Sequence, residues 1–177
     1  MVGMLIFFVF FTGANSAQSI LHEEEEGTLA RLFTTPTSRT AILAGKFLAV
    51  VFTTGVQSIV LLLLSAMVFG ISWGRPASLV FMIAALVLAS SGFGICLMSL
   101  IKNLRQSGPV IGGVLTTTGM LGGLMTTGIA MPKAFEIVNL AVPQGWALRG
   151  LKLVLDGGSL LDVLPSFLVL MAMGGVL

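Results

Sequence analysis

Long apolar runs separated by short polar stretches form the dominant pattern along this chain. Four runs contain no Asp, Glu, Lys or Arg, at residues 1–21, 47–74, 76–101 and 106–132. Each run reaches or exceeds the roughly 20 residues with which a helix crosses a bilayer. A fifth apolar run, 163–177, ends with the chain. The pattern predicts an all-α integral membrane protein with about five transmembrane helices.

We expect one transmembrane domain over residues 1–177, with polar connections between its spans. The predicted spans are 1–21, 47–71, 77–101, 107–131 and 159–177. The connections are 22–46, 72–76, 102–107 and 132–158. Because successive spans alternate in direction, the first and third connections should lie on one side of the membrane. That side carries five Lys/Arg residues against four on the other, a small excess that favours a cytoplasmic location.

Composition indicates lipid rather than water as the solvent. Hydrophobic residues make up 56% of the chain and charged residues 9%, whereas soluble domains carry about 25% charged residues. The single Cys96 cannot form an internal disulfide, and the single His22 argues against a histidine-based metal site. No basic cluster with interleaved aromatic residues points to nucleic acid. A signal peptide is an alternative for the first run, which contains "ANSA" but lacks a basic start.

The first connection, "HEEEEGTLARLFTTPTSRTAILAGK", holds the most distinctive local pattern. Glu23–Glu26 are too costly to place in hydrocarbon, so they must lie in water or against protein. Leu29, Leu32 and Phe33 follow at helical spacing and form one apolar stripe. The pattern therefore predicts a short amphipathic helix with an acidic shoulder, held between two spans.

Local signals set the limits of this short helix. Gly27 allows a bend after the acidic run, and Pro36 ends the helix. Thr37 or Ser38 can then cap the helix that leads into the second span. Three interpretations stay open: a solvated loop, a helix in the headgroup layer, or a helix that docks in a groove of a soluble partner.

The order of residue types in this connection resembles the cytoplasmic segment of ABC-2 type transporter permeases. In that family, acidic residues precede Gly-Thr-Leu, Arg-Leu, a Thr-Pro pair and a Gly-Lys that enters the next span. The matching positions are Glu25, Glu26, Gly27, Thr28, Leu29, Arg31, Leu32, Thr35 and Pro36. The resemblance implies a coupling helix, which docks on a separate nucleotide-binding ATPase subunit and transmits ATP-driven movement to the spans.

The fourth connection carries a second resemblance to the same family. There a Met-Pro pair opens a noncytoplasmic excursion of short helices, followed by a Pro-x-x-Trp-Ala element. The matching residues are Met131, Pro132, Pro143, Trp146 and Ala147. The resemblance implies that Pro143 and Trp146 lie at the noncytoplasmic interface before the last span. It also implies that the chain holds spans two to six of a six-span permease, truncated at both ends.

The resemblance further implies the membrane-spanning subunit of an ABC exporter in a bacterial or archaeal cytoplasmic membrane. Its partners would be the ATPase subunit, a second permease in a homo- or heterodimer, and membrane lipids. The chain has no G-x-x-x-x-G-K-[ST] motif. We therefore expect it to bind no cofactor directly, with ATP and Mg held by the partner, and we predict no catalytic or metal-binding residue.

The predicted fourth span is rich in glycine and threonine. Gly108 and Gly112, and likewise Gly119 and Gly123, are spaced so that helix backbones can approach closely. Helix packing is one interpretation of this pattern. The other is a pathway-lining helix at a dimer interface, with Gly108, Gly112, Thr116, Gly119, Met120 and Gly123 as its candidate residues.

Other functions remain as alternatives. The uncharged spans argue against a proton-coupled transporter or a charge-lined channel, although a passive channel or secondary transporter stays open. An intramembrane protease would need a buried base or paired carboxylates, yet His22, Asp156 and Asp162 lie outside the uncharged runs. A non-functional membrane fragment or anchor is the remaining alternative.

Overall fold

The structure is a computed structural model that describes residues 1–34, 36–126 and 133–176. Within these ranges all regular secondary structure is α-helical, as predicted. The helices are α1 (Val2–Glu25), α2 (Thr28–Leu32), α3 (Arg39–Phe69), α4 (Pro76–Ser99), α5 (Leu104–Leu121), α6 (Lys133–Asn139), α7 (Pro143–Leu155) and α8 (Leu160–Val176).

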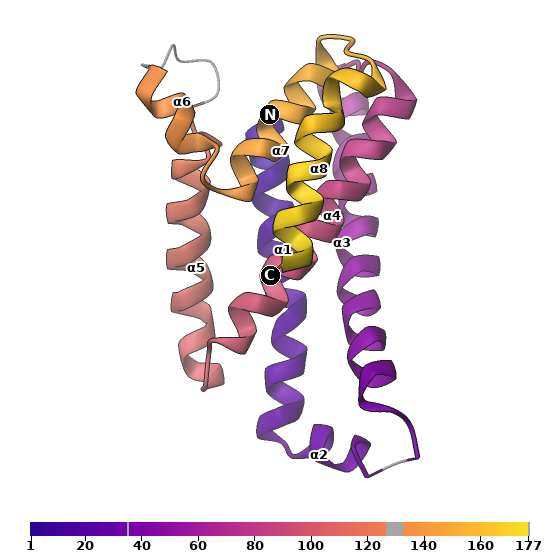
Figure 1. Ribbon diagram of the computed structural model, residues 1–177, viewed down its shortest axis with the longest axis vertical. Helices are drawn as coiled ribbons and strands as arrows, with labels where there is room; N and C mark the ends of the chain where they lie inside the picture. Colours follow the sequence, from indigo (N-terminus) through magenta and orange to yellow (C-terminus); the bar gives the residue numbers. More distant parts are fainter. Residues whose placement is uncertain (35, 127–132, 177) are drawn as a thin grey trace.

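The connections between the long helices fall at two opposite ends of the molecule (Figure 1). The segment with α2 and the turn between α4 and α5 lie at one end, which we call the α2 end. The α3–α4 turn, α6 and the turn between α7 and α8 lie at the other, which we call the α6–α7 end. This arrangement agrees with the alternation of connections predicted from the sequence.

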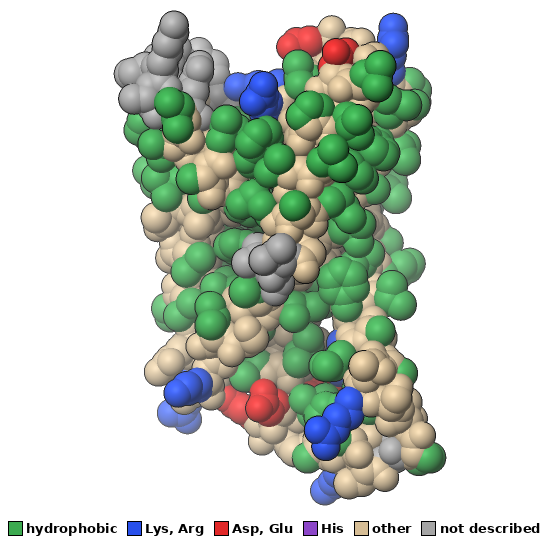
Figure 2. Space-filling model, viewed as in Figure 1, with side chains coloured by type: hydrophobic (Ala, Val, Ile, Leu, Met, Phe, Trp, Pro, Cys, Tyr) green, Lys and Arg blue, Asp and Glu red, His purple; other side chains and the backbone are tan. Residues whose placement is uncertain are grey.

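Three of the described helices, α1, α3 and α4, are long and apolar enough to cross a membrane. Helix α8 is apolar but shorter. On the face shown in Figure 2, hydrophobic side chains cover the middle of the molecule and charged side chains gather at its two ends. Helices α1, α3 and α4 thus match three of the five predicted spans by length and composition. Helix α5 is shorter than predicted, whereas α8 begins within one residue of the predicted fifth span 159–177.

Close backbone contact between α1 and α4 forms the centre of the fold. A Cβ added at Gly94 would lie 2.7 Å from the carbonyl of Gly13, and one added at Gly13 would lie 2.7 Å from the carbonyl oxygen of Ser90. Two helices come this near only where side chains are absent from the contact. Beside it pack Ile6, Phe10 and other fully buried residues of the single core cluster.

Helices α7 and α8 also pack closely against α4 at glycine residues. A Cβ at Gly92 would meet the Gly174 carbonyl oxygen of α8 at 2.4 Å, and one at Gly150 of α7 would meet the Met82 methyl group at 2.2 Å. In contrast, most of α3 faces outward, with Phe52 and Met67 among its exposed side chains. The packed centre therefore consists of α1, α4, α7 and α8, with α3 and α5 at its sides.

One helix limit near the α2 end differs from the predicted span. Helix α1 does not stop near residue 21 but continues through Glu25, so the acidic run forms its last turn. Helix α3 begins at Arg39, which agrees with the predicted helix that leads into the second span. Its N-cap is Ser38, one of the two predicted cap residues. The Ser38 side chain accepts a hydrogen bond from Ala41 N at 3.3 Å.

The predicted span 107–131 is wrong at its C-terminal limit, because α5 ends at Leu121. Gly123 adopts φ +73°, and its N–H donates to Met120 O. The next N–H, of Leu124, donates to Gly119 O. These two bonds around a left-handed glycine define a Schellman motif, which stops the helix. Gly123 therefore does not share a helix face with Gly119, contrary to the predicted pairing.

The α1–α4 contact should limit stability. We expect Gly94→Ala to lower the free energy of unfolding by about 1–3 kcal/mol, the usual cost of overpacking. Gly55→Ala on α3, where an added Cβ meets nothing within 4 Å, is the matched control and should be neutral or stabilising. Thermal unfolding of both variants in detergent, followed by circular dichroism, measures the difference. Equal midpoints would contradict the assigned contact.

Candidate functional site

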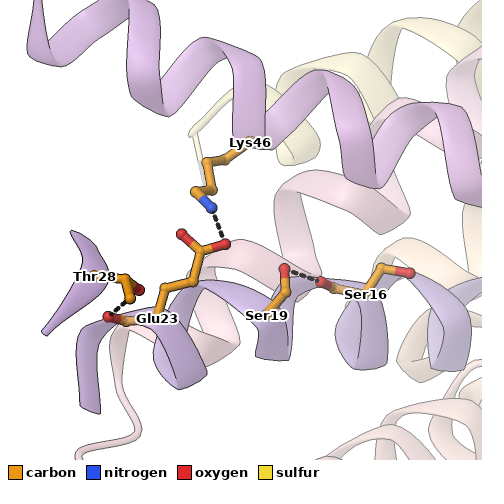
Figure 3. Close-up of polar contacts among 5 residues, drawn as sticks. All are labelled: Ser16, Ser19, Glu23, Thr28 and Lys46. Carbon is orange, nitrogen blue, oxygen red and sulfur yellow. Dashed lines mark hydrogen bonds and ion pairs between the residues drawn. The ribbon is translucent and has the colours of Figure 1, made fainter. Parts of the chain in front are cut away.

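A left-handed glycine joins the acidic end of α1 to the short helix α2. Gly27 has φ +71°, a conformation that residues with a Cβ rarely adopt. Its N–H donates to Glu24 O at 3.1 Å, and the Thr28 hydroxyl donates to Glu23 O at 3.0 Å (Figure 3). The predicted bend at Gly27 is confirmed. These bonds satisfy carbonyl groups at the end of α1 and fix the direction of α2.

The glutamates at the end of α1 lie where the helix dipole disfavours negative charge. Neighbouring helices compensate for this charge. The Lys46 ammonium of α3 forms an ion pair with Glu23, and both side chains are partly buried (Figure 3). His22 Nε2 lies 3.1 Å from Glu26 Oε1, one turn apart on the exposed surface. The acidic run thus holds the beginning of α3 against the end of α1.

Glu25 connects the same acidic run to α5. Its Oε1 accepts a hydrogen bond from the backbone N–H of Leu104 at 2.6 Å. The next N–H, of Arg105, donates to the Asn103 side chain at 2.9 Å. The first amides of a helix have no partner within it, so Glu25 completes the cap of α5 from a different helix. The acidic end of α1 is therefore bonded to both α3 and α5.

The predicted apolar stripe of α2 is divided between the inside and the outside of the chain. Leu29 is only 9% exposed and lies where α2 packs on α1. Leu32 is 39% exposed. The Phe33 ring is half-buried, with the Arg39 guanidinium 5.5 Å from its centroid. Only part of the stripe is thus accessible from outside the chain.

The remaining predicted residues of this segment lie on or near its surface. Glu26, Thr28, Arg31 and Pro36 are exposed. Thr35 lies outside the residues that the structure describes. The surface at the α2 end thus combines carboxylates with a guanidinium and part of an apolar stripe, a mixture that suits a protein partner.

The predicted candidates on α5 separate into two faces. Gly108, Gly112, Thr116 and Met120 recur at four-residue spacing and lie on one outward stripe, along which Met120 is 56% exposed. A Cβ added at Gly108 or Gly112 would meet nothing within 4 Å. Gly119 faces inward instead, where an added Cβ would lie 3.2 Å from the Phe7 ring. Helix packing therefore applies to the Gly119 face, and the pathway interpretation stays a prediction for the outward stripe.

A polar groove that sequence reasoning missed lies between α1 and α5. Its cavity of about 610 Å³ is lined by Asn15, Gln18, Ser19, His22, Leu104, Arg105, Ser107 and Gly108. The Gln18 amide donates to the Ser107 hydroxyl at 2.6 Å across it. The α1 residues repeat at intervals of three and four, which places them on one helix face. This helical spacing of polar residues within an apolar run is the sequence feature that could have predicted the groove.

The predicted interfacial residues Pro143 and Trp146 lie in the first two turns of α7, and their place at a membrane interface stays a prediction. Pro143 is buried at the first position of α7, where a missing N–H costs little. The Trp146 indole donates to Leu140 O at 2.8 Å, and the Arg149 guanidinium lies 5.6 Å from its ring centroid. Met131 and Pro132 fall outside the described residues. Among the described residues, no cluster of His, Cys, Asp and Glu could hold a metal ion.

Comparisons with known proteins give a consistent result. A family model described as "ABC-2 family transporter protein" matches residues 1–177. The chain is 28% identical over 175 residues to the linearmycin resistance permease protein LnrN of Bacillus subtilis (strain 168). This match covers 98% of the chain but 46% of the relative, so the chain spans about half of that protein's length. No solved structure matches the chain.

The bond from Glu25 to α5 leads to a local prediction. Glu25→Ala should weaken the start of α5 by about 1 kcal/mol, the typical value of a helix cap, and speed amide exchange there about fivefold. Glu24→Ala is the matched control, because Glu24 is exposed and its side chain has no hydrogen bond or ion pair among the described residues. Hydrogen exchange followed by mass spectrometry measures both variants. Unchanged exchange in residues 104–108 of Glu25→Ala would contradict the cap.

Proposed function

The chain belongs to the ABC-2 family of transporter proteins, and we propose that it forms the part of an exporter's permease subunit that receives movement from an ATPase. The observation that supports this proposal is the set of bonds at the acidic end of α1, to which α2 is attached. Glu23 and Glu25 of α1 bond to α3 and α5, and the Gly27 N–H donates to Glu24 O, which ties the start of α2 to the same helix end. A force applied at α2 would therefore act on several membrane helices together.

The ATPase contact would lie at the α2 end, on the cytoplasmic side. Its surface would include Glu26, Arg31 and Leu32, with Leu29 supporting α2 from inside the chain. ATP and Mg would be held by the ATPase subunit and not by this chain. This assignment modifies the expected role of Glu25, which would serve mainly to position α5 and only secondarily to contact the partner.

A second permease would pack against the outward stripe of α5. Gly108 and Gly112 leave the backbone uncovered along this stripe, so another helix can approach closely. The polar groove of Asn15 and Gln18 lies directly beside Gly108. Two copies facing each other here would enclose a path lined by hydroxyl, amide and methionine side chains. Such a lining suits an amphipathic substrate, and a homodimer or a heterodimer would both provide it.

Export from a bacterial or archaeal cell is the proposed direction of transport. The similar protein from Bacillus subtilis is described as a linearmycin resistance permease, and removal of a toxic compound is one way to provide resistance. A passive channel or secondary transporter is the competing function. It differs in one observable respect, because its flux would not depend on α2 or on ATP. A membrane fragment without transport activity would show no flux at all.

The proposed ATPase contact can be tested with one added charge. In the complete transporter, Leu32→Asp should reduce ATP-dependent export at least tenfold, because a carboxylate cannot occupy an apolar contact without a partner. Membrane insertion should not change. Ala30→Asp adds the same charge to an exposed position of the same helix and is the control. Export into inverted vesicles and the ATPase rate measure coupling. Unchanged export in Leu32→Asp would overturn the coupling role.

The proposed dimer face can be tested by cross-linking. In a Cys96→Ser background, which removes the single native cysteine, Gly112→Cys should form a disulfide-linked dimer under mild oxidation. Gly55→Cys on α3 is the control and should remain monomeric on a denaturing gel. Equal cross-linking at the two positions, or none at Gly112, would argue against this face.

A further inference from the structure

A cavity at the α6–α7 end has the composition of an anion site. It measures about 420 Å³ and is lined by Gly122, Asn139, Leu140, Gly145, Leu148, Arg149 and Lys152. Its lining residues come from the C-terminal ends of α5 and α6 and from α7. With its amide in the orientation that its neighbours require, Asn139 donates through its side-chain nitrogen to Leu121 O and Phe135 O, which fixes α6 against the end of α5. The walls are therefore held by hydrogen bonds and by backbone contact.

Two cations supply the charge of this cavity. Arg149 and Lys152 lie three residues apart on α7, so their side chains share one helix face. Among the described side chains, neither forms an ion pair with a carboxylate. Asp156 lies one turn beyond Lys152 but makes no such pair. The cavity thus has two positive groups that no described side chain neutralises.

The apolar part of the cavity points to an amphiphile rather than to a simple ion. Leu140 and Leu148 are among its lining residues. Leu121, which precedes the lining residue Gly122, is 38% exposed at the end of the apolar helix α5. Trp146 lies beside Arg149 with its ring against apolar surroundings and its N–H bonded to Leu140 O. Tryptophan and cationic side chains in this combination are typical of the headgroup level of a membrane.

We propose that this cavity binds the phosphate headgroup of an anionic phospholipid at the α6–α7 end. Arg149 and Lys152 would contact the phosphate oxygens, while Leu140 and Leu148 would contact the upper part of the acyl chains. The cavity is large enough for a headgroup but not for a whole lipid, so the chains would extend along α5. A bound lipid would stabilise the packing of α7 against the end of α5. This site is independent of the proposed ATP-driven transport.

Trp146 provides a direct probe of the site. The chain has two tryptophans, so Trp73→Phe leaves Trp146 as the single fluorophore. This variant is reconstituted in phosphatidylcholine vesicles that contain a small fraction of brominated lipid, which quenches nearby tryptophan. We expect brominated phosphatidylglycerol to quench Trp146 at about fivefold lower mole fraction than brominated phosphatidylcholine, a factor typical of one cation beside an anionic surface. Equal quenching by the two lipids would overturn the proposal.

Substitutions of Arg149 and Lys152 test whether these two cations cause the preference for phosphatidylglycerol. Arg149→Gln with Lys152→Gln should remove the preference, so that both brominated lipids quench equally after normalisation to vesicles without bromine. Arg75→Gln, which changes a cation at the N-cap of α4 and outside the cavity lining, is the control and should keep it. A preference that persists in the double variant would overturn the assigned site. If the double variant fails to insert, Arg149→Gln and Lys152→Gln are measured singly, and each should reduce the preference.

Inorganic phosphate distinguishes a lipid headgroup from a free anion. A lipid that also contacts Leu140 and Leu148 should not be displaced by phosphate added in excess at constant ionic strength. The preference for phosphatidylglycerol should then remain within a factor of two. Loss of the preference with phosphate, but not with chloride at equal ionic strength, would show a site for free phosphate and overturn the lipid proposal.

Discussion

The contact of the α1 backbone with the α4 backbone is the constraint on which the other elements depend. In a lipid environment, apolar side chains gain little by leaving the solvent, so helices associate through close packing and hydrogen bonds. Gly13 and Gly94 allow that packing at the centre of the molecule. Helices α7 and α8 then attach to α4 through Gly150 and Gly174. The placement of glycine, more than the amount of apolar surface, determines which helices become neighbours.

Charged side chains determine the structure at the C-terminal end of α1. Four consecutive glutamates at the C-terminus of a helix oppose its dipole, and an isolated helix with this sequence would fray there. The Lys46 side chain and the Leu104 amide, which come from two other helices, compensate for Glu23 and Glu25. The order of the α2 end is therefore a tertiary property. It exists only when α3 and α5 are in place around α1.

Much of the helical organisation could be predicted from the sequence, because long uncharged runs have few alternatives in a membrane. The bend at Gly27 and the cap at Ser38 also rest on local chemistry and are confirmed. The end of α5 could not be predicted from hydropathy, because Gly122 and Gly123 lie within an uncharged run. Their neighbours give no sign that Gly123 would adopt a left-handed conformation rather than pack against another helix.

The candidate site was predictable in its location but not in its contacts. The spacing of Leu29, Leu32 and Phe33 indicates one apolar face, yet it does not reveal that Leu29 points into the chain. Likewise, the acidic run indicates charge at the surface, but the partner of Glu25 is 79 residues away in the chain. Contacts at such separation follow from the packing of α1 against α5 and leave no local pattern.

The small size of α2 has a mechanical consequence. Five residues form less than two turns of helix, which is far too short to be stable alone in water. Its shape must come from its attachments, namely Gly27 on one side and the cap of α3 on the other. Because its shape depends on these attachments, the segment cannot be displaced as a helix without disturbing the ends of α1 and α3 as well.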